Sequence, residues 1–201
     1  MFGGNRFSVL DVNDRVFKEN DKKHVLIKHE ETFKLKFYNT YNVRMQIDVY
    51  LNGKVGDEKA LIGSWILREG QDAIIETNKN SGQLFTFVKM NSLEFFSEIE
   101  AYVKEEANWG LVSVRFRTEN DYNSEVKRGF SKENKLESTR SKGISYDAGG
   151  IALSGSSDQE FGTTHAITSW GSVDTIYAIR LVENKINSLY SKAVPEYNYP
   201  V

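Results

Sequence analysis

Alternation of apolar and polar residues is the clearest pattern in this chain. From Thr32 onward, the apolar residues Phe33, Leu35 and Phe37 alternate with lysines, which is typical of a strand that buries one face. The run 43–51 alternates in the same way and predicts the best-defined strand, with Val43, Met45, Ile47, Val49 and Leu51 buried. Both runs indicate β structure packed on one apolar core.

Glycine and asparagine divide much of the remaining chain into short strands. Asn52-Gly53 predicts a tight hairpin turn, because both residues tolerate positive φ, and the chain then returns through 61–67. Further strands are expected at 73–76, 84–88, 110–117 and 175–182. In the third of these, Val112, Val114 and Phe116 should point inward. Strands of this length and spacing favour an all-β fold, an antiparallel β-sandwich of a jelly-roll-like kind.

One segment breaks the alternation and predicts a short helix near 92–105. Asn91-Ser92 precede it as a helix cap would. Its apolar residues recur at spacings of three and four, namely Leu93, Phe96, Ile99 and Val103.

The pattern along the chain predicts one domain with extended ends. We interpret 1–22 as an N-terminal arm, or alternatively as a frayed end with one edge strand. The β-sandwich domain spans 23–182, and 183–201 forms a C-terminal tail. Within the domain, 118–148 is rich in charged and polar residues and predicts a long surface loop or insertion. This loop is either mobile or ordered by a neighbouring chain.

Composition narrows the classes of protein that fit. Lys and Arg total 26 against 28 Asp and Glu, so no net charge draws the chain toward nucleic acid or an anionic membrane. The absence of cysteine excludes disulfides and thiolate metal sites, and it suits a reducing compartment. The sequence shows neither a secretory leader nor about 18 consecutive apolar residues, so we expect a soluble, unprocessed protein without a membrane partner.

Candidate chemistry is sparse, and we expect no catalytic, cofactor-binding or metal-binding residues. The three histidines, His24, His29 and His165, are too dispersed to form a metal-binding motif. Gly155-Ser156-Ser157 lacks the strand-to-helix setting of a serine nucleophile, and the nearby glycines match no phosphate-binding motif.

Two other kinds of site stay open at the level of sequence. Carboxylates that could form a glycosidase pair are present, but nothing selects two of them: Asp48, Glu76, Asp147, Asp158 and Glu160. Arg115 and Arg117, beside Trp109 and Phe116, could form a small nucleic-acid surface. Outward arginines on a strand are more often its solvated face, so we do not expect a nucleic-acid partner.

Two stretches carry a resemblance to a known family. The first runs from Val49-Tyr50-Leu51-Asn52-Gly53 to Phe85-Thr86-Phe87-Val88-Lys89, and the second from Gly149 to Phe161, closing with Ile179-Arg180-Leu181-Val182. Together they resemble small β-rich, sandwich-like virion-associated proteins of large DNA viruses and tailed phages. The resemblance covers 32–116 and 149–182, and its most specific part is the L-S-G-x-S-x-Q-x-F element that begins at Leu153.

This resemblance implies a non-enzymatic structural component of a virus or phage particle. Such a protein would be a minor capsid, decoration or head-attached protein, located in the virion and assembled in the host cytoplasm. It implies binding to other virion proteins, capsid or head components, through arms and loops, as a homo-oligomer or in multiple copies. It provides no catalytic residues to transfer, and no cofactor is expected. The charged insertion at 118–148 and the two arms depart from the family pattern.

Aromatic residues near the two ends of the chain, together with Trp170, are the candidate partner contacts. The candidates are Phe2, Phe7, Trp170, Tyr197 and Tyr199. Aromatic side chains are common anchors at interfaces, although those in the arms could equally pack on their own domain.

The alternative function is a surface recognition module, either lectin-like or a host-attachment protein. It would use Trp65, Trp109 or Trp170, together with tyrosines, as stacking platforms, so the exposure of these rings decides which of them could serve. Trp65 lies in an apolar run typical of core, whereas Trp170 is expected to face outward. A third possibility is an enzyme, which a cleft with two pKa-shifted carboxylates would favour.

Overall fold

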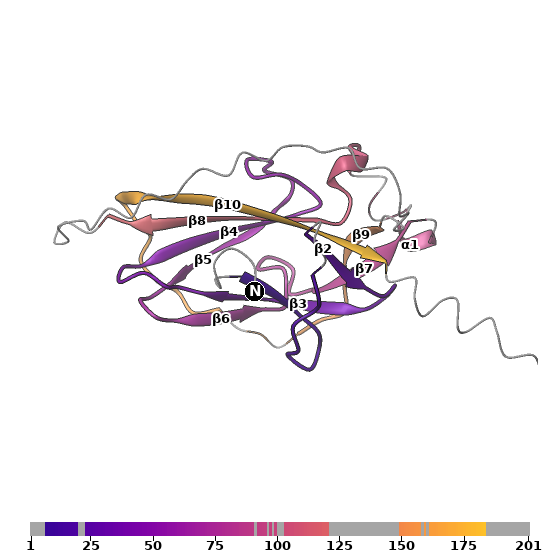
Figure 1. Ribbon diagram of the computed structural model, residues 1–201, viewed down its shortest axis with the longest axis horizontal. Helices are drawn as coiled ribbons and strands as arrows, with labels where there is room; N and C mark the ends of the chain where they lie inside the picture. Colours follow the sequence, from indigo (N-terminus) through magenta and orange to yellow (C-terminus); the bar gives the residue numbers. More distant parts are fainter. Residues whose placement is uncertain are drawn as a thin grey trace, which may run out of the picture.

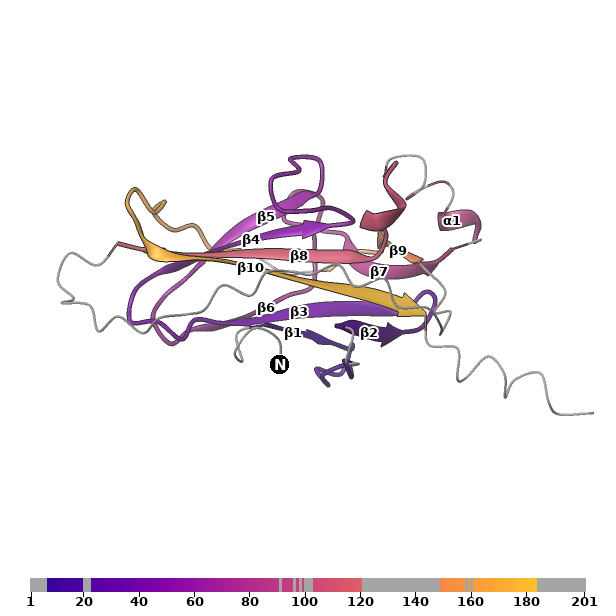
Figure 2. The ribbon, with the colours of Figure 1, turned by 45° about the horizontal axis from the view of Figure 1, so that its top comes forward.

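The chain folds as a sandwich of two five-stranded sheets (Figures 1 and 2). The computed structural model describes residues 7–19, 23–90, 92–95, 97, 99, 103–120, 149–157, 159 and 161–183. Its strands are β1 (Phe7–Leu10), β2 (His24–Ile27), β3 (Thr32–Tyr38), β4 (Met45–Leu51), β5 (Leu61–Leu67), β6 (Asp72–Ile75), β7 (Leu84–Lys89), β8 (Leu111–Glu119), β9 (Gly149–Ser154) and β10 (Trp170–Glu183). The all-β sandwich expected from the sequence is therefore confirmed, whereas the jelly-roll arrangement stays a prediction.

The two sheets differ in how their strands are connected. In the first sheet, the order is β1-β3-β7-β9, and β6 pairs with β3 on the edge opposite β1. In the second sheet, the order is β2-β10-β8-β4-β5. One pair departs from the antiparallel pattern, because β2 runs parallel to β10. The second sheet therefore joins an early segment of the described chain to its last strand.

The core lies between the sheets and follows the predicted alternation. Phe33, Leu35 and Phe37 of β3 are buried, as are every second residue of β4 and of β8. The Phe37 ring lies 6.1 Å from that of Phe116 in the opposite sheet, which places an aromatic contact across the two layers. Each such side chain contributes about 1.5–3 kcal/mol when fully buried. Val43, predicted to be buried in the strand, lies before it and is only partly buried.

The segment predicted as an N-terminal arm is in part a strand of the sandwich. β1 pairs with β3, and the chain then turns so that Val16 bridges Leu10 and Glu19 bridges Val25 of β2. Residues 7–19 therefore form the edge structure that was the alternative to an arm. Residues 1–6 and 20–22 lie outside the described residues.

Of the predicted helix near 92–105, the described residues include one helical turn, α1 (Leu93–Phe95), and a separate 3-10 turn, η2 (Glu106–Asn108), follows the predicted range. The Ser92 hydroxyl accepts a hydrogen bond from the Phe95 N–H at 3.1 Å, so the predicted cap is confirmed at Ser92. The predicted apolar face was wrong at Leu93, which is 84% exposed. Ile99 is buried as predicted, and Phe95, which was not predicted to face the core, packs with it near Trp109.

The remaining boundaries differ from prediction at several points. The connection from β4 to β5 is the loop 52–60 rather than a tight turn. β8 continues to Glu119, into the start of the predicted loop 118–148, of which 121–148 lies outside the described residues. β10 begins at Trp170, before the predicted strand 175–182, and ends at Glu183. Residues 184–201 of the predicted tail are not among the described residues.

Two side-chain amides close the outer edges of strands in the first sheet. The Asn52 Oδ1 accepts hydrogen bonds from the N–H groups of Ile151 at 2.9 Å and Gly110 at 3.1 Å, and its Nδ2 donates to the Ile151 carbonyl at 2.7 Å. On β6, the Gln159 Nε2 donates to the Ile74 carbonyl at 2.7 Å. Its Oε1 accepts from the Glu76 N–H at 3.1 Å. Each amide therefore makes the backbone hydrogen bonds that a neighbouring strand would otherwise make.

The element Gly149–Phe161, which carries the most specific part of the resemblance, is built into the sandwich. Ser154 shares a hydrogen bond of 2.6 Å with Thr86, and the Ser157 hydroxyl donates to the Glu76 carboxylate at 2.5 Å. The Phe161 ring then lies 5.7 Å from that of Trp65 in β5, edge to face. This element therefore connects the first sheet to the second.

Candidate interaction surface on strands β8 and β10

The partner-contact residues predicted from the sequence lie in different environments. Trp170, at the start of β10, is 40% exposed, which confirms that its ring faces outward. Phe7 is fully buried and stacks on Phe37 at 5.2 Å, so it packs on its own domain and is not accessible to a partner. Phe2, Tyr197 and Tyr199 lie outside the described residues.

Of the three tryptophans considered as stacking platforms, only Trp170 is accessible. Trp65 and Trp109 are both buried. Trp65 packs against Phe161, and the Trp109 ring meets that of Phe95 at 4.8 Å. Among the tryptophans, the recognition alternative therefore depends on Trp170.

The outer face of the second sheet, which we call the β8–β10 face, is built on a buried carboxylate. Asp48 of β4 is 4% exposed and accepts hydrogen bonds from Ser64 at 2.6 Å and Gln46 at 2.7 Å. Its second oxygen accepts from the Arg117 guanidinium of β8 at 2.9 Å. These three donors compensate the negative charge of Asp48, whose burial would otherwise be costly.

Trp170 covers this ion pair from the solvent side. The Arg117 guanidinium carbon lies 4.1 Å from the centroid of the Trp170 ring, which is a cation–π arrangement. The Arg117 Nε is buried and has no hydrogen-bond partner in the described part of the chain. Arg117 is therefore held between the Asp48 carboxylate and the indole ring.

Two further arginines on this face are also paired with carboxylates. Arg115 donates to both oxygens of Asp174 in β10, at 2.8 and 2.5 Å, and these hydrogen bonds lower the pKa of Asp174. Arg44 donates to Glu119 at 2.8 Å through its Nε and also through NH2, and these hydrogen bonds lower the pKa of Glu119. The face thus carries matched charges rather than an excess of positive charge for phosphates.

An exposed aliphatic side chain completes the face. Ile176 of β10 is 52% exposed and lies opposite Arg115 in the strand register. Sequence reasoning did not select it, although the signal was present: since Tyr177 and Ile179 point inward, alternation places Ile176 outward. Asp48 and Asp174 were also not recognised as the partners of the two arginines, because pairing across strands requires the register.

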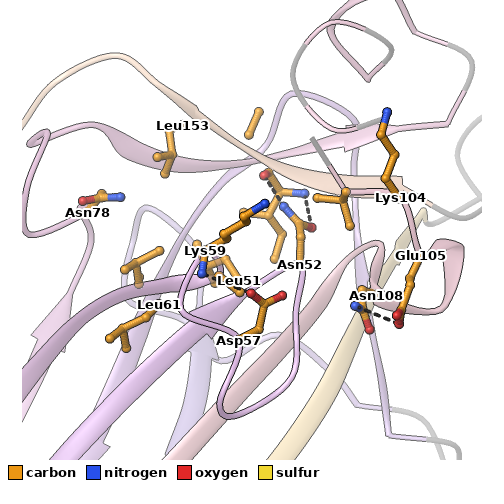
Figure 3. A pocket seen from close by; sticks show the side chains of 15 residues that line it. Leu51, Asn52, Asp57, Lys59, Leu61, Asn78, Lys104, Glu105, Asn108 and Leu153 are labelled. Atoms are coloured by element: carbon orange, nitrogen blue, oxygen red, sulfur yellow. Dashed lines mark hydrogen bonds between the residues drawn. The ribbon is translucent and has the colours of Figure 1, made fainter. Parts of the chain in front are cut away.

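A pocket of about 960 Å³ opens beside the loop 52–60, next to Asn52 (Figure 3). Its apolar wall includes Leu51 and Leu153, while Asp57 and Lys59 lie on the loop 52–60 beside it. Charges of both signs therefore border an apolar hollow.

Of the carboxylates considered for chemistry, Asp48 and Glu76 are described, and they have different partners. Glu76 accepts from Ser157 and lies 3.7 Å from the Lys34 ammonium group, whereas Asp48 belongs to the β8–β10 face. No group of three or more His, Asp or Glu side chains that could hold a metal ion occurs among the described residues. Asp147, Asp158 and Glu160 lie outside them. No helix in the described ranges is long and apolar enough to span a membrane.

Comparison with known proteins adds no relative: no family model, no curated protein and no solved structure matches this chain. The fold and the surface together define an all-β sandwich with an aromatic and aliphatic patch on a charge-paired sheet face.

Proposed function

We propose that this chain is a non-enzymatic structural component of a virus or phage particle. It would act as a minor capsid, decoration or head-attached protein, assembled with the particle in the host cytoplasm. It binds neighbouring particle proteins through the β8–β10 face. The proposal of this binding surface rests on one observation. Trp170 and Ile176 are exposed on a face whose charged groups are otherwise paired.

The chemistry of this face suits a protein partner. Tryptophan and arginine are the residue types most enriched among the energetically dominant contacts of interfaces. Here the guanidinium of Arg117 already has its carboxylate, so covering it with a partner does not leave a charge unpaired. The strands beneath are paired on a sheet, which reduces the conformational entropy that binding must overcome.

The particle role is supported by the resemblance at the level of the fold. The L-S-G-x-S-x-Q-x-F element supplies contacts between the sheets, including the amide of Gln159 on β6 and the ring of Phe161 on Trp65. Because this element makes contacts between the two sheets, we expect proteins that share the sandwich fold to share it. Multiple copies on a particle would add avidity to weak individual contacts.

The test is to purify particles of the encoding virus or phage and measure this chain in them by mass spectrometry. We expect the wild-type chain to be present and Trp170→Ala to reduce its incorporation at least about tenfold, because truncation of an anchoring tryptophan typically costs 2 kcal/mol or more. Leu93→Ala is the control, since Leu93 is exposed on α1, a different element. Urea unfolding of both variants separates lost binding from lost folding.

Absence of the wild-type chain from purified particles would refute the particle role. Incorporation of folded Trp170→Ala at the wild-type level would refute the β8–β10 face as the contact.

The second candidate is a surface recognition module, favoured by the accessible indole of Trp170. Indole rings can stack on sugar rings through apolar contact, and here the Arg117 guanidinium occupies part of the ring surface. A recognition role predicts that Trp170→Ala is incorporated normally but that the particles attach less to host cells. Normal attachment by such particles would count against this candidate.

A further inference from the structure

The two long edges of β10 are occupied very differently. On one edge, β8 pairs with it from Trp170 to Arg180, with a bulge between Trp170 and Asp174. On the other edge, β2 pairs only with Arg180–Glu183. In the described part of the chain, no strand pairs with this second edge between Asp174 and Ile179. Figure 1 shows β10 as a long strand with β2 beside its far end.

The direction of two hydrogen bonds identifies the backbone groups on this open edge. The Arg180 N–H donates to the Lys23 carbonyl at 3.2 Å, on the β2 side, whereas the Leu181 N–H donates to the Gly110 carbonyl at 2.8 Å, on the β8 side. Because backbone groups alternate along an antiparallel strand, the N–H and C=O groups of Asp174, Ile176 and Ala178 face the open edge.

Within the described residues, the open edge lacks the usual protection against pairing with another chain. Natural edge strands are blocked by lysine, proline or inward charges, or are covered by another element. Between Asp174 and Ile179, the single charged residue is Asp174, and Arg115 neutralises it. Thr175, Ile176 and Tyr177 all favour extended strands. The bulge before Asp174 is the only blocking device in this part of β10, and it leaves the rest of the edge available.

We propose that this edge pairs antiparallel with the same edge of a second copy of the chain, with Ile176 on the two-fold axis. Only residues whose backbone groups face the edge can exchange hydrogen bonds, so the axis must keep Asp174, Ile176 and Ala178 opposite one another. Centring on Ile176 achieves this and places each Asp174 opposite the Ala178 of the other copy. It also packs the two exposed Ile176 side chains together on the outer face.

Axes at Asp174 or Thr175 are less favourable for charge or for apolar burial. An axis at Asp174 would set two carboxylates directly opposite each other, which is destabilising. An axis at Thr175 would place Asp174 against an isoleucine and leave both Ile176 side chains without an apolar partner. The Ile176 register alone among these gives apolar contact and separates the aspartates.

The size of the contact determines how the pairing should behave. Two short strand segments bury less than about 1,200 Å² in total, the lower limit of standard interfaces, so the isolated dimer should be weak and reversible. The result is a continuous sheet across two copies. This pairing follows from β10 alone and does not depend on the particle role, because it concerns the purified chain.

The first test measures association of the purified chain by sedimentation velocity up to about 500 µM, a range suited to a weak dimer. We expect a concentration-dependent dimer for the wild type and a monomer for Ile176→Lys, because a charge on the axis would face its own copy. Leu93→Lys is the matched control: it places the same charge at another exposed apolar residue and should retain the dimer. Circular dichroism and urea unfolding establish that both variants fold.

The second test uses the absence of cysteine in the chain, which makes single substitutions clean reporters. Under mild oxidation, Ile176→Cys should form a disulfide-linked dimer at least tenfold faster than Leu93→Cys. A mixture of Asp174→Cys and Ala178→Cys chains should give mixed dimers, as the register requires. Any of three results would overturn the proposal. The wild type could be monomeric at every concentration, the dimer could be unaffected by Ile176→Lys, or Ile176→Cys and Leu93→Cys could cross-link equally fast.

Discussion

Two arginines on the same strand, Arg115 and Arg117, show how burial determines the contribution of an ion pair to stability. Arg117 contacts Asp48, whose side chain is 6% exposed, and Trp170 covers the pair. Arg115 contacts Asp174, whose side chain is 47% exposed. Exposed pairs contribute little to stability, whereas loss of one partner from a buried pair leaves a charge without compensation.

We therefore predict that Arg117→Met lowers the free energy of unfolding by about 2–3 kcal/mol, because the Asp48 carboxylate would keep only its neutral donors. Methionine preserves much of the apolar stem under Trp170. The control is Arg115→Met, which should cost less than about 1 kcal/mol. Urea denaturation at neutral pH measures both, and equal losses would show that Trp170 does not shield the Arg117 pair.

At the residue scale, the candidate surface was only partly predictable from the sequence. Trp170 could be placed outward because it lies among small and polar residues, and the structure confirms this. Phe7 could not be placed, because its burial depends on pairing with β3, which no local pattern reveals. Ile176 was within reach of the alternation rule, but its neighbours Arg115 and Asp174 were not, since they come from different strands.

Among the elements, the strands with strong alternation were predicted well. β3, β4 and β8 each bury one face along their length, so their pattern is a local property of the sequence. The short helical segment was less predictable, because Phe95 rather than Leu93 faces the core. The closure of strand edges by Asn52 and Gln159 could not be predicted, since it depends on residues far apart in the chain.

The Asn52 amide gives a direct test of this closure. Asn52→Gly should retain the backbone, because glycine adopts the φ of 53° readily, but it should lower the free energy of unfolding by about 2–4 kcal/mol. The cause is that the N–H groups of Ile151 and Gly110 and the Ile151 carbonyl would lose their partner. Urea denaturation measures the loss, and hydrogen exchange should show faster exchange at the Ile151 amide.

A control for this substitution is available in a surface loop. The Asn78 Oδ1 also accepts from backbone N–H groups, those of Asn80 and Ser81, but these groups are exposed to water. Asn78→Gly should therefore cost less than about 1 kcal/mol. A loss at Asn52 no larger than at Asn78 would contradict a structural role for the buried amide.

For the molecule as a whole, Gly110 marks the point where three strands from both sheets meet. It precedes β8, and its carbonyl accepts from Leu181 of β10 while its N–H donates to Asn52. A Cβ at this position would lie 2.6 Å from the Leu181 carbonyl oxygen and 2.9 Å from that of Gly149 in β9. The close approach of the two sheets here thus requires glycine.

Gly110→Ala should consequently destabilise the fold by about 3 kcal/mol or more, from the positive φ together with the clash against two backbone oxygens. Gly70→Ala is the matched control, because Gly70 has a similar φ of 63° but nothing within 4 Å of an added Cβ. It should cost about 1 kcal/mol. Thermal and urea unfolding of the two variants would reveal the clash as their difference, and equal costs would contradict it.

The parallel pairing of β2 with β10 also has a consequence for synthesis on the ribosome. β10 lies between β2 and β8 in its sheet, yet it is the last described strand to be translated. At about 5–20 residues per second, roughly 8–30 s pass between the emergence of β2 and that of β10. Until β10 emerges, β2 and, once it has been translated, the β10-facing edge of β8 lack their shared neighbour. Chaperones that bind exposed apolar strands therefore have time to act on the nascent chain.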